Sequence, residues 1–182
     1  MSSELIKSEV QIIASSEYNF KIELILDIGK EDIPDLIETS RGLVDIFGDR
    51  ALLNQNNIYK YFSKDTLPFI ARHKGTIIGY IIGVPLEHFS QESWSHFDKN
   101  LNKNNTLYTY AFVIRKKFQG KNGYAKTLKR IYLNWAKKRD YKYISGHVTH
   151  GICQKFKKTE LVKTFPIWYE AQSPFDYYRR TL

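Results

Sequence analysis

Residues 106–138 constrain the fold more than any other part of the sequence, because three kinds of segment follow one another there. The run TLYTYAFVI at 106–114 is aromatic and β-branched, which is typical of a buried strand. A turn rich in Lys and Gly follows at 115–123. Apolar side chains then recur on one helical face, at Tyr124, Leu128, Ile131, Tyr132 and Trp135. The sequence therefore predicts a strand, a basic turn and an amphipathic helix.

The junction between this turn and the helix is suited to binding an anion. The first N–H groups of a helix have no partner within the helix, and the helix dipole is positive at that end. A loop that contains glycine lets an anion approach the backbone closely. We therefore predict that an anion binds where the helix begins.

Length and composition indicate a globular protein. The 182 residues suffice for one domain with a core that needs neither disulfides nor a metal. Hydrophobic residues make up 42% and aromatic residues 15%, so disorder is not expected of the chain as a whole. The single cysteine, Cys153, excludes an intramolecular disulfide and a Cys-based metal cage, and we expect no metal. Residues 1–18 show no long apolar run after a basic start, so we expect no signal peptide. No apolar run approaches roughly 20 residues, so we expect a soluble, cytoplasmic protein without a membrane partner.

The net charge of +9 indicates an anionic partner. Nucleic acid, a phosphorylated cofactor and an acidic protein each meet this requirement. The positive residues concentrate in the second half of the chain, at 115–117, 121–139 and 155–163. A solvated surface without a partner is an interpretation of equal weight.

The hydrophobic pattern divides the chain into an extension and one domain. Residues 1–18 are expected to form an N-terminal extension, partly disordered, in which 10–14 is either a short strand or part of a frayed helix. Residues 19–182 are expected to form a single domain. Its predicted elements are a strand (21–27), two helical segments (31–40 and 50–62), a hairpin (67–72 and 76–84), a mostly irregular stretch (86–105), a strand (106–114), a helix (124–138), a strand (141–148), a short helix (150–156) and two strands (162–170 and 175–181).

This order of elements is that of an α+β fold. Strands that follow one another closely favour antiparallel pairing, and the amphipathic helices need a sheet face to cover. We expect a mixed, mostly antiparallel sheet flanked by helices on both faces.

The basic turn resembles the signature of the GNAT superfamily of acyl-CoA-dependent N-acyltransferases. In that family an Arg or Gln, two residues, a Gly, one residue and a Gly or Ala form a loop whose N–H groups hold the pyrophosphate of coenzyme A. Gln119 matches the first position, and Gly123 and Ala125 match the last two, with one residue too many after Gln119. Asn122 is either an insertion or lies in a left-handed conformation, which Asn tolerates. The order of elements extends the resemblance over about residues 20–182.

The resemblance implies a cosubstrate and a place for it. The fourth and fifth strands of the sheet, here 106–114 and 141–148, would splay apart. The pantetheine arm of acetyl-CoA would lie in that wedge and hydrogen-bond to the fourth strand. The cofactor-binding residues that follow are Phe112, Val113 and Ile114 on the strand and Gln119, Gly120, Lys121, Asn122, Gly123, Tyr124 and Ala125 on the loop.

The usual catalytic acid and base of the family have no match in this sequence. Tyr108 stands where many relatives have a Glu base, and Phe156 stands where many have a Tyr acid. Some members act mainly by positioning a free amine against the thioester. The remaining catalytic candidates are His147, whose ordinary pKa suits a base at neutral pH, Tyr108 and Glu87. For all three, an ordinary structural or surface role is the more common outcome.

Three functions are compatible with these observations. The first is an N-acetyltransferase that moves an acetyl or other acyl group from acyl-CoA to a primary amine by direct attack in a ternary complex. Its acceptor is left open between a small molecule, a peptide and a protein lysine. The second is a catalytically silent module that binds acyl-CoA or a partner, which Tyr108 and Phe156 favour. The third is an RNA-directed protein, such as an acetyltransferase that acts on charged tRNA. RNA is less favoured as a partner because no aromatic-basic platform stands out. Both a monomer and a homodimer are left open.

Overall fold

An eight-stranded sheet in the order β1-β2-β3-β4-β5-β6-β8-β7 forms the centre of the molecule. The computed structural model describes residues 5–17 and 19–182. The strands are β1 (Glu9–Ser15), β2 (Phe20–Asp27), β3 (Leu67–His73), β4 (Thr76–Pro85), β5 (Thr106–Ile114), β6 (Tyr143–Thr149), β7 (Thr159–Phe165) and β8 (Phe175–Thr181). Neighbouring strands are antiparallel except β5 and β6, which are parallel. The predicted mixed, mostly antiparallel sheet is confirmed.

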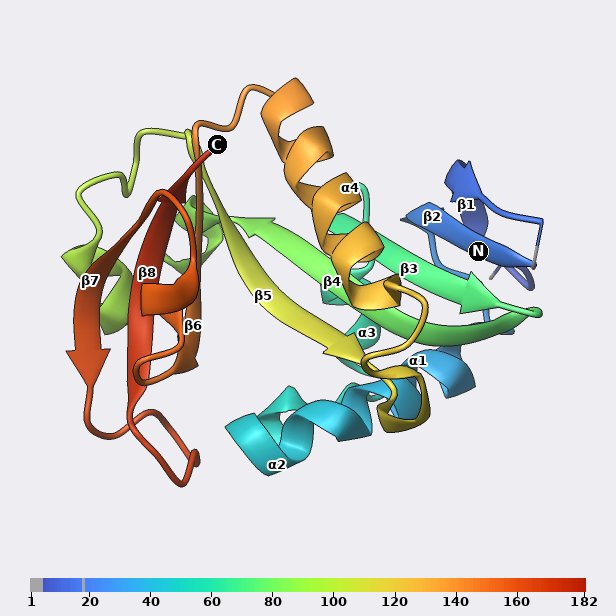
Figure 1. Ribbon diagram of the computed structural model, residues 1–182, viewed down its shortest axis with the longest axis horizontal. Coiled ribbons are helices and arrows are strands. Elements are labelled where there is room, and N and C mark those ends of the chain that lie inside the picture. The colour runs from blue at the N-terminus through green and yellow to red at the C-terminus, as the bar shows by residue number, and fades with distance from the viewer. Residues whose placement is uncertain (1–4, 18) are drawn as a thin grey trace.

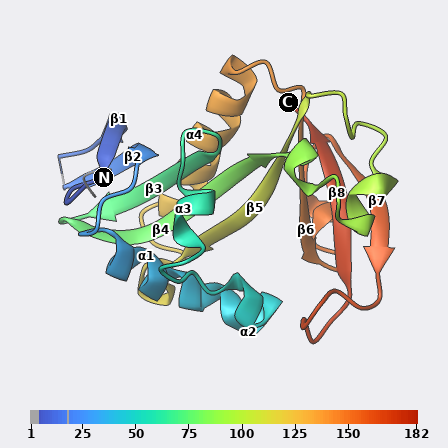
Figure 2. The ribbon, with the colours of Figure 1, turned by 180° about the vertical axis from the view of Figure 1, so that it is seen from behind.

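Helices cover both faces of this sheet, as expected (Figures 1 and 2). They are α1 (Ile33–Ser40), α2 (Val44–Phe47), α3 (Ile58–Tyr61) and α4 (Tyr124–Lys138). Helix α4 crosses one face alone, and α1, α2 and α3 lie on the other. Leu128, Tyr132 and Ala136 of α4 are buried against β3 and β5, so the predicted apolar face of this helix is the one that packs. The order of elements therefore places β5 between two hydrophobic layers.

Strands β5 and β6 pair along only part of their length. Their register runs from Thr106 opposite Tyr143 to Thr109 opposite Gly146. Beyond these pairs β5 continues to Ile114, and β6 continues to Thr149, without pairing to each other. The predicted splaying of these two strands is thus confirmed, and Figure 1 shows β6, β7 and β8 turning away from the rest of the sheet.

A bulge in β5 lies at the point where the two strands part. Thr109 lies opposite Gly83 and Ala111 lies opposite Ile82, which leaves Tyr110 as an extra residue in the ladder. Such a bulge bends a strand and re-aims its side chains. Tyr108, Tyr110 and Ala111 consequently all reach the face that α1, α2 and α3 cover.

The segment 50–62 is not the helix that its apolar spacing predicted. It contains a 3-10 turn at Asp49–Ala51 and the single helical turn α3. Between them, Asn54 accepts the backbone N–H groups of Asn56 and Asn57 on its side-chain oxygen. Asparagine side chains compete with helical hydrogen bonds in this way. The spacing of apolar residues, on which the helix was predicted, contains no information about this competition.

The predictions for the last third of the chain also need correction. The predicted helix 150–156 is only a 3-10 turn at Cys153–Lys155, because the buried Asp176 carboxylate accepts the N–H of Gly151 (2.8 Å) and fixes a tighter turn. The predicted strand 162–170 is β7, which ends before Pro166, a residue without an N–H for the ladder. Trp168 and Tyr169 therefore lie in the β7–β8 connection.

The N-terminal segment adds a strand at the sheet edge. Of the two alternatives for residues 10–14, the strand is correct, because β1 pairs with β2. Within the described part of the chain, no helix is long and apolar enough to cross a membrane.

Candidate active site

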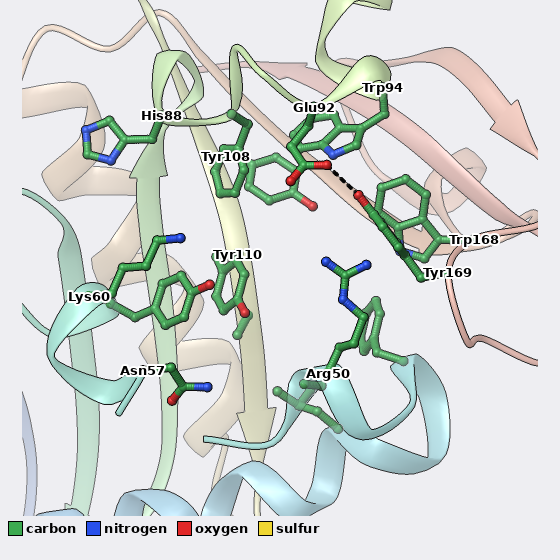
Figure 3. Close-up of a pocket in the computed structure, with 16 residues that line it drawn as sticks. Arg50, Asn57, Lys60, His88, Glu92, Trp94, Tyr108, Tyr110, Trp168 and Tyr169 are labelled. Atoms are coloured by element: carbon green, nitrogen blue, oxygen red, sulfur yellow. Dashed lines mark hydrogen bonds between the residues drawn. The ribbon is translucent and has the colours of Figure 1, made fainter. Parts of the chain in front are cut away.

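A cavity of about 360 Å³ opens beside β5 on the face that carries α1, α2 and α3 (Figure 3). Its walls come from α3, β5, the 3-10 turn at Ser93–Phe97 and the β7–β8 connection. We call it the aromatic cavity, because aromatic residues make up half of its lining, namely Phe47, Tyr61, Phe89, Trp94, Tyr108, Tyr110, Trp168 and Tyr169. The rings of Tyr61 and Tyr110 stack with their centroids 4.0 Å apart.

Cationic side chains enter the aromatic cavity from two sides. Figure 3 shows Arg50 and Lys60 extending into it from different elements. The Arg50 guanidinium carbon lies 3.6 Å from the centroid of the Tyr169 ring. Glu92 is the only carboxylate in the lining, and its Oε2 accepts the Tyr169 hydroxyl at 2.8 Å. Neither Arg50 nor Lys60 forms an ion pair with a carboxylate of the described residues.

A second cavity of about 370 Å³ occupies the wedge between the splayed strands, on the α4 side of β5. We call it the wedge cavity; its lining includes Thr109, Phe112, Lys129, Tyr132, Val148, Phe156 and Tyr178. The two cavities share Phe47, Tyr108, Tyr110 and Ala111. They therefore adjoin at the bulge of β5, and molecules bound in the two cavities would meet there.

The predicted catalytic candidates Tyr108 and His147 are in contact at this junction. The Tyr108 hydroxyl lies 2.7 Å from His147 Nδ1, and both side chains are buried. The imidazole also stacks on Trp168, with ring centroids 3.6 Å apart. Burial lowers the pKa of His147 well below its ordinary value, so the ring is neutral at pH 7. Burial raises the pKa of the Tyr108 phenol, which keeps its proton. A neutral base is thus hydrogen-bonded to a phenol that lines both cavities.

The third candidate, Glu87, lies elsewhere. Its Oε1 accepts the backbone N–H of Asn104 at 3.0 Å, and its side chain lines neither cavity. The structure therefore brings together two of the three residues that the sequence suggested.

The loop between β5 and α4 presents an open stretch of backbone. Gly120, Asn122 and Gly123 have φ angles of 67°, 50° and 67°, so the left-handed alternative for Asn122 is the one observed. The space where a Cβ on Gly120 or Gly123 would lie is empty. The N–H groups of residues 120–123 donate to no acceptor among the described residues. These donors are available to a bound anion.

Side chains of the loop contact the body of the domain and fix the position of the loop. Gln119 Nε2 donates to the Ile114 carbonyl at 2.9 Å. The Tyr124 ring is buried and packs against Phe20 and His73, and Phe118 packs against His73 as well. Gln119 and Tyr124 thus shape the loop through their side chains, while the backbone of the loop faces outward.

The end of β5 directs alternate backbone groups into the wedge. Arg115 N–H donates to Ile78 O of β4, and strand alternation then places Val113 towards β4 too. The backbone groups of Phe112 and Ile114 point the other way, where β5 has lost its neighbour. Of the three predicted strand residues, Phe112 and Ile114 face the wedge, and Ile114 O is already occupied by Gln119.

Several residues of the site were not predicted from the sequence. Arg50 and Lys60 lay within the supposed helix 50–62, where nothing set them apart from surface cations. Lys129 of α4 was not among the predicted site residues either, and its Nζ lies 4.4 Å from the centroid of the Phe156 ring at the wedge cavity. Burial lowers the pKa of this ammonium group.

Comparison with known proteins places these features in a family. The model of the acetyltransferase (GNAT) family matches residues 37–151. Comparison of the sequence with curated proteins gives no match. The solved structure of a GCN5-related N-acetyltransferase from Kribbella flavida is similar, with a TM-score of 0.65, 14% identity and coverage of 92% of this chain and 100% of that one. The solved structure of ribosomal-protein-alanine N-acetyltransferase from Brucella melitensis is also similar, with a TM-score of 0.62 and 13% identity. The match covers 84% of this chain and 95% of that one. At these identities the structures support the fold alone.

Proposed function

Because this chain belongs to the acetyltransferase (GNAT) family, in which an acyl group passes from acyl-CoA to an amine, we propose how its two cavities divide that reaction. Acetyl-CoA lies with its diphosphate on the loop 119–125 and its pantetheine arm in the wedge cavity. The amine acceptor enters through the aromatic cavity. The thioester then reaches the bulge of β5, where the two cavities adjoin.

The open amides of the loop carry this proposal. Four consecutive N–H groups, at residues 120–123, have no acceptor in the described chain and adjoin the start of α4. Such a cluster, at the positive end of a helix dipole, suits a diphosphate. Lys116, Lys117 and Lys121 add positive charge around it. The wedge cavity and the free backbone groups of Phe112 support the position of the pantetheine arm.

The acyl transfer itself requires that the attacking amine lose a proton. The amine nitrogen attacks the thioester carbonyl, the C–N bond forms and the C–S bond breaks. The amine proton passes to the Tyr108 oxygen while the Tyr108 proton passes to His147 Nδ1, along the 2.7 Å hydrogen bond. The thiolate of coenzyme A leaves and takes up that proton from His147, which lines the wedge cavity, so the Tyr108–His147 pair returns to its neutral state. Because burial lowers the pKa of His147, this imidazole is a weak base, so positioning of the two substrates supplies most of the acceleration.

Substitution of Gly123 by valine tests the position of the diphosphate. A β-branched side chain at a φ of 67° shifts the backbone and covers the amides, so acetyl-CoA should bind at least about tenfold more weakly. Gly75, with a φ of 82° in the β3–β4 turn and no neighbour within 4 Å of a Cβ, provides the matched control. Gly75→Val introduces similar strain and should leave binding unchanged. Calorimetry in which neither acetyl-CoA nor a longer acyl-CoA binds the unmodified protein would refute the proposed function.

A further inference from the structure

The charge of the aromatic cavity restricts which amine can enter it. This inference rests on the proposed function, in which that cavity receives the acceptor. Among the described residues of its lining, Arg50 and Lys60 carry two positive charges and Glu92 carries one negative charge, so the lining has a positive excess. A lone ammonium ion approaching these two cations would be repelled. A ligand that brings its own negative charge would not be.

Arg50 and Lys60 are both placed to meet a carboxylate that enters the aromatic cavity. The Arg50 guanidinium carbon lies 3.6 Å from the centroid of the Tyr169 ring, and the guanidinium forms no ion pair among the described residues, so it can take a carboxylate partner. Lys60 reaches the same space from α3 (Figure 3). Both side chains are exposed at the mouth of the cavity, so a carboxylate can pair with them without being fully desolvated. Nearby cations also lower the pKa of a bound amine, which favours the neutral form that attacks a thioester.

The walls specify the remainder of the ligand. Tyr61, Tyr110, Phe47 and Trp94 present ring faces and edges, which favour an apolar or aromatic group. The volume of about 360 Å³ is at the lower end of the range for small-molecule sites.

We propose that the acceptor is a free amino acid with a large apolar or aromatic side chain. Its carboxylate pairs with Arg50 and Lys60, its side chain lies among the rings, and its α-amine faces Tyr108. The products are the N-acyl amino acid and free coenzyme A. A peptide N-terminus or a lysine of a protein lacks an adjacent carboxylate and would leave both cations unpaired beside the incoming amine.

Ligand binding tests this proposal without requiring turnover. L-phenylalanine, L-phenylalaninamide and phenethylamine differ in the carboxylate and share the ring and the amine. Trp94 and Trp168 line the cavity, so their fluorescence reports binding to the protein saturated with coenzyme A. L-phenylalanine should bind about 10- to 100-fold more tightly than the two analogues, the range for a charge-assisted hydrogen-bonded pair. Release of coenzyme A from acetyl-CoA should follow the same order.

Three variants identify the residues responsible. Arg50→Gln should remove most of the preference for the acid while binding of phenylalaninamide changes little, and Arg50→Lys should restore part of it. Lys64→Gln removes an exposed lysine that does not line the cavity and should change nothing. Circular dichroism shows whether each variant is folded.

The outcomes separate the two proposals. Equal binding of the acid and the amide, preference for a lysine-containing peptide, or no binding of any of these amines would overturn the amino acid proposal. If acetyl-CoA still binds in those cases, the proposed function stands. If acetyl-CoA does not bind and L-phenylalanine does, the proposed function fails and the amino acid site stands.

Discussion

The buried imidazole of His147 should make the protein sensitive to mild acid. Its ring is enclosed by Trp94, Trp168 and Tyr177, and burial keeps it neutral in the folded protein. In the unfolded chain the imidazole is exposed to water, and its pKa is then near the ordinary value of 6.5. Between that value and the lower pKa of the native state, the unfolded chain binds one proton more than the native chain. Stability is therefore complete above pH 6.5 and falls as the pH is lowered.

The size of this effect follows from the linkage relation. Each pH unit below 6.5 over which the native imidazole stays neutral lowers the unfolding free energy by about 1.4 kcal/mol. His147→Gln retains a group that can hydrogen-bond to Tyr108 and cannot be protonated. This variant should be less stable than the original protein at pH 7.5, yet it should lack that additional loss. Carboxylates that titrate near pH 5 affect both proteins equally and cancel in the comparison.

Urea unfolding followed by tryptophan fluorescence at pH 7.5, 6.5, 5.5 and 5.0 measures the effect. Tyr108→Phe provides the control, because it removes the hydroxyl at 2.7 Å and leaves the imidazole buried. Acid sensitivity should persist in this variant. Equal losses in His147→Gln and in the original protein would show that His147 is not the buried neutral base described above. The proposed proton transfer from Tyr108 to His147 would then have no support.

Two further predictions concern the packing around the site. Arg72→Met should lower the unfolding free energy, measured in urea at pH 7, by about 3–5 kcal/mol, because Arg72 pairs with the buried carboxylates of Glu23 (3.0 Å) and Asp32 (2.9 Å). The control Arg41→Met breaks an exposed ion pair and should lower it by less than about 1 kcal/mol. Equal effects of the two substitutions would contradict this reasoning. Gly83→Ala should lower the unfolding free energy by about 1–3 kcal/mol, because the added Cβ would lie 2.6 Å from a Leu107 side-chain atom. An unchanged melting temperature would show that this contact can relax.

The parts of the structure that could be predicted from the sequence are those determined by interactions between residues close together in the chain. The strand, the loop and helix α4 at 106–138 follow from side-chain alternation, glycine and helical periodicity, which act within a few residues. The left-handed conformation of Asn122 was one of two alternatives on the same local grounds. These segments carry the proposed cosubstrate site, so that part of the site was accessible from the sequence.

The acceptor side of the site depends on contacts between distant segments. Arg50 lies over Tyr169, and Tyr108 contacts His147, across separations of 119 and 39 residues. Neither pair leaves a periodic pattern in the sequence. The bulge at Tyr110 shows the same limit, because it exists only in the register of β5 against β4. Periodicity therefore located the strand and did not reveal which of its side chains would meet in one cavity.

The absence of an acidic residue at position 108 is consistent with the charge of the aromatic cavity. A carboxylate at that position would face the same space as Arg50 and Lys60 and would attract these cations itself. It would also repel an acceptor that carries a carboxylate. The neutral pair of Tyr108 and His147 can take the amine proton without either effect. An uncharged proton acceptor and two cations that outnumber the single lining carboxylate, Glu92, thus belong to one arrangement, which suits an amine with its own negative charge.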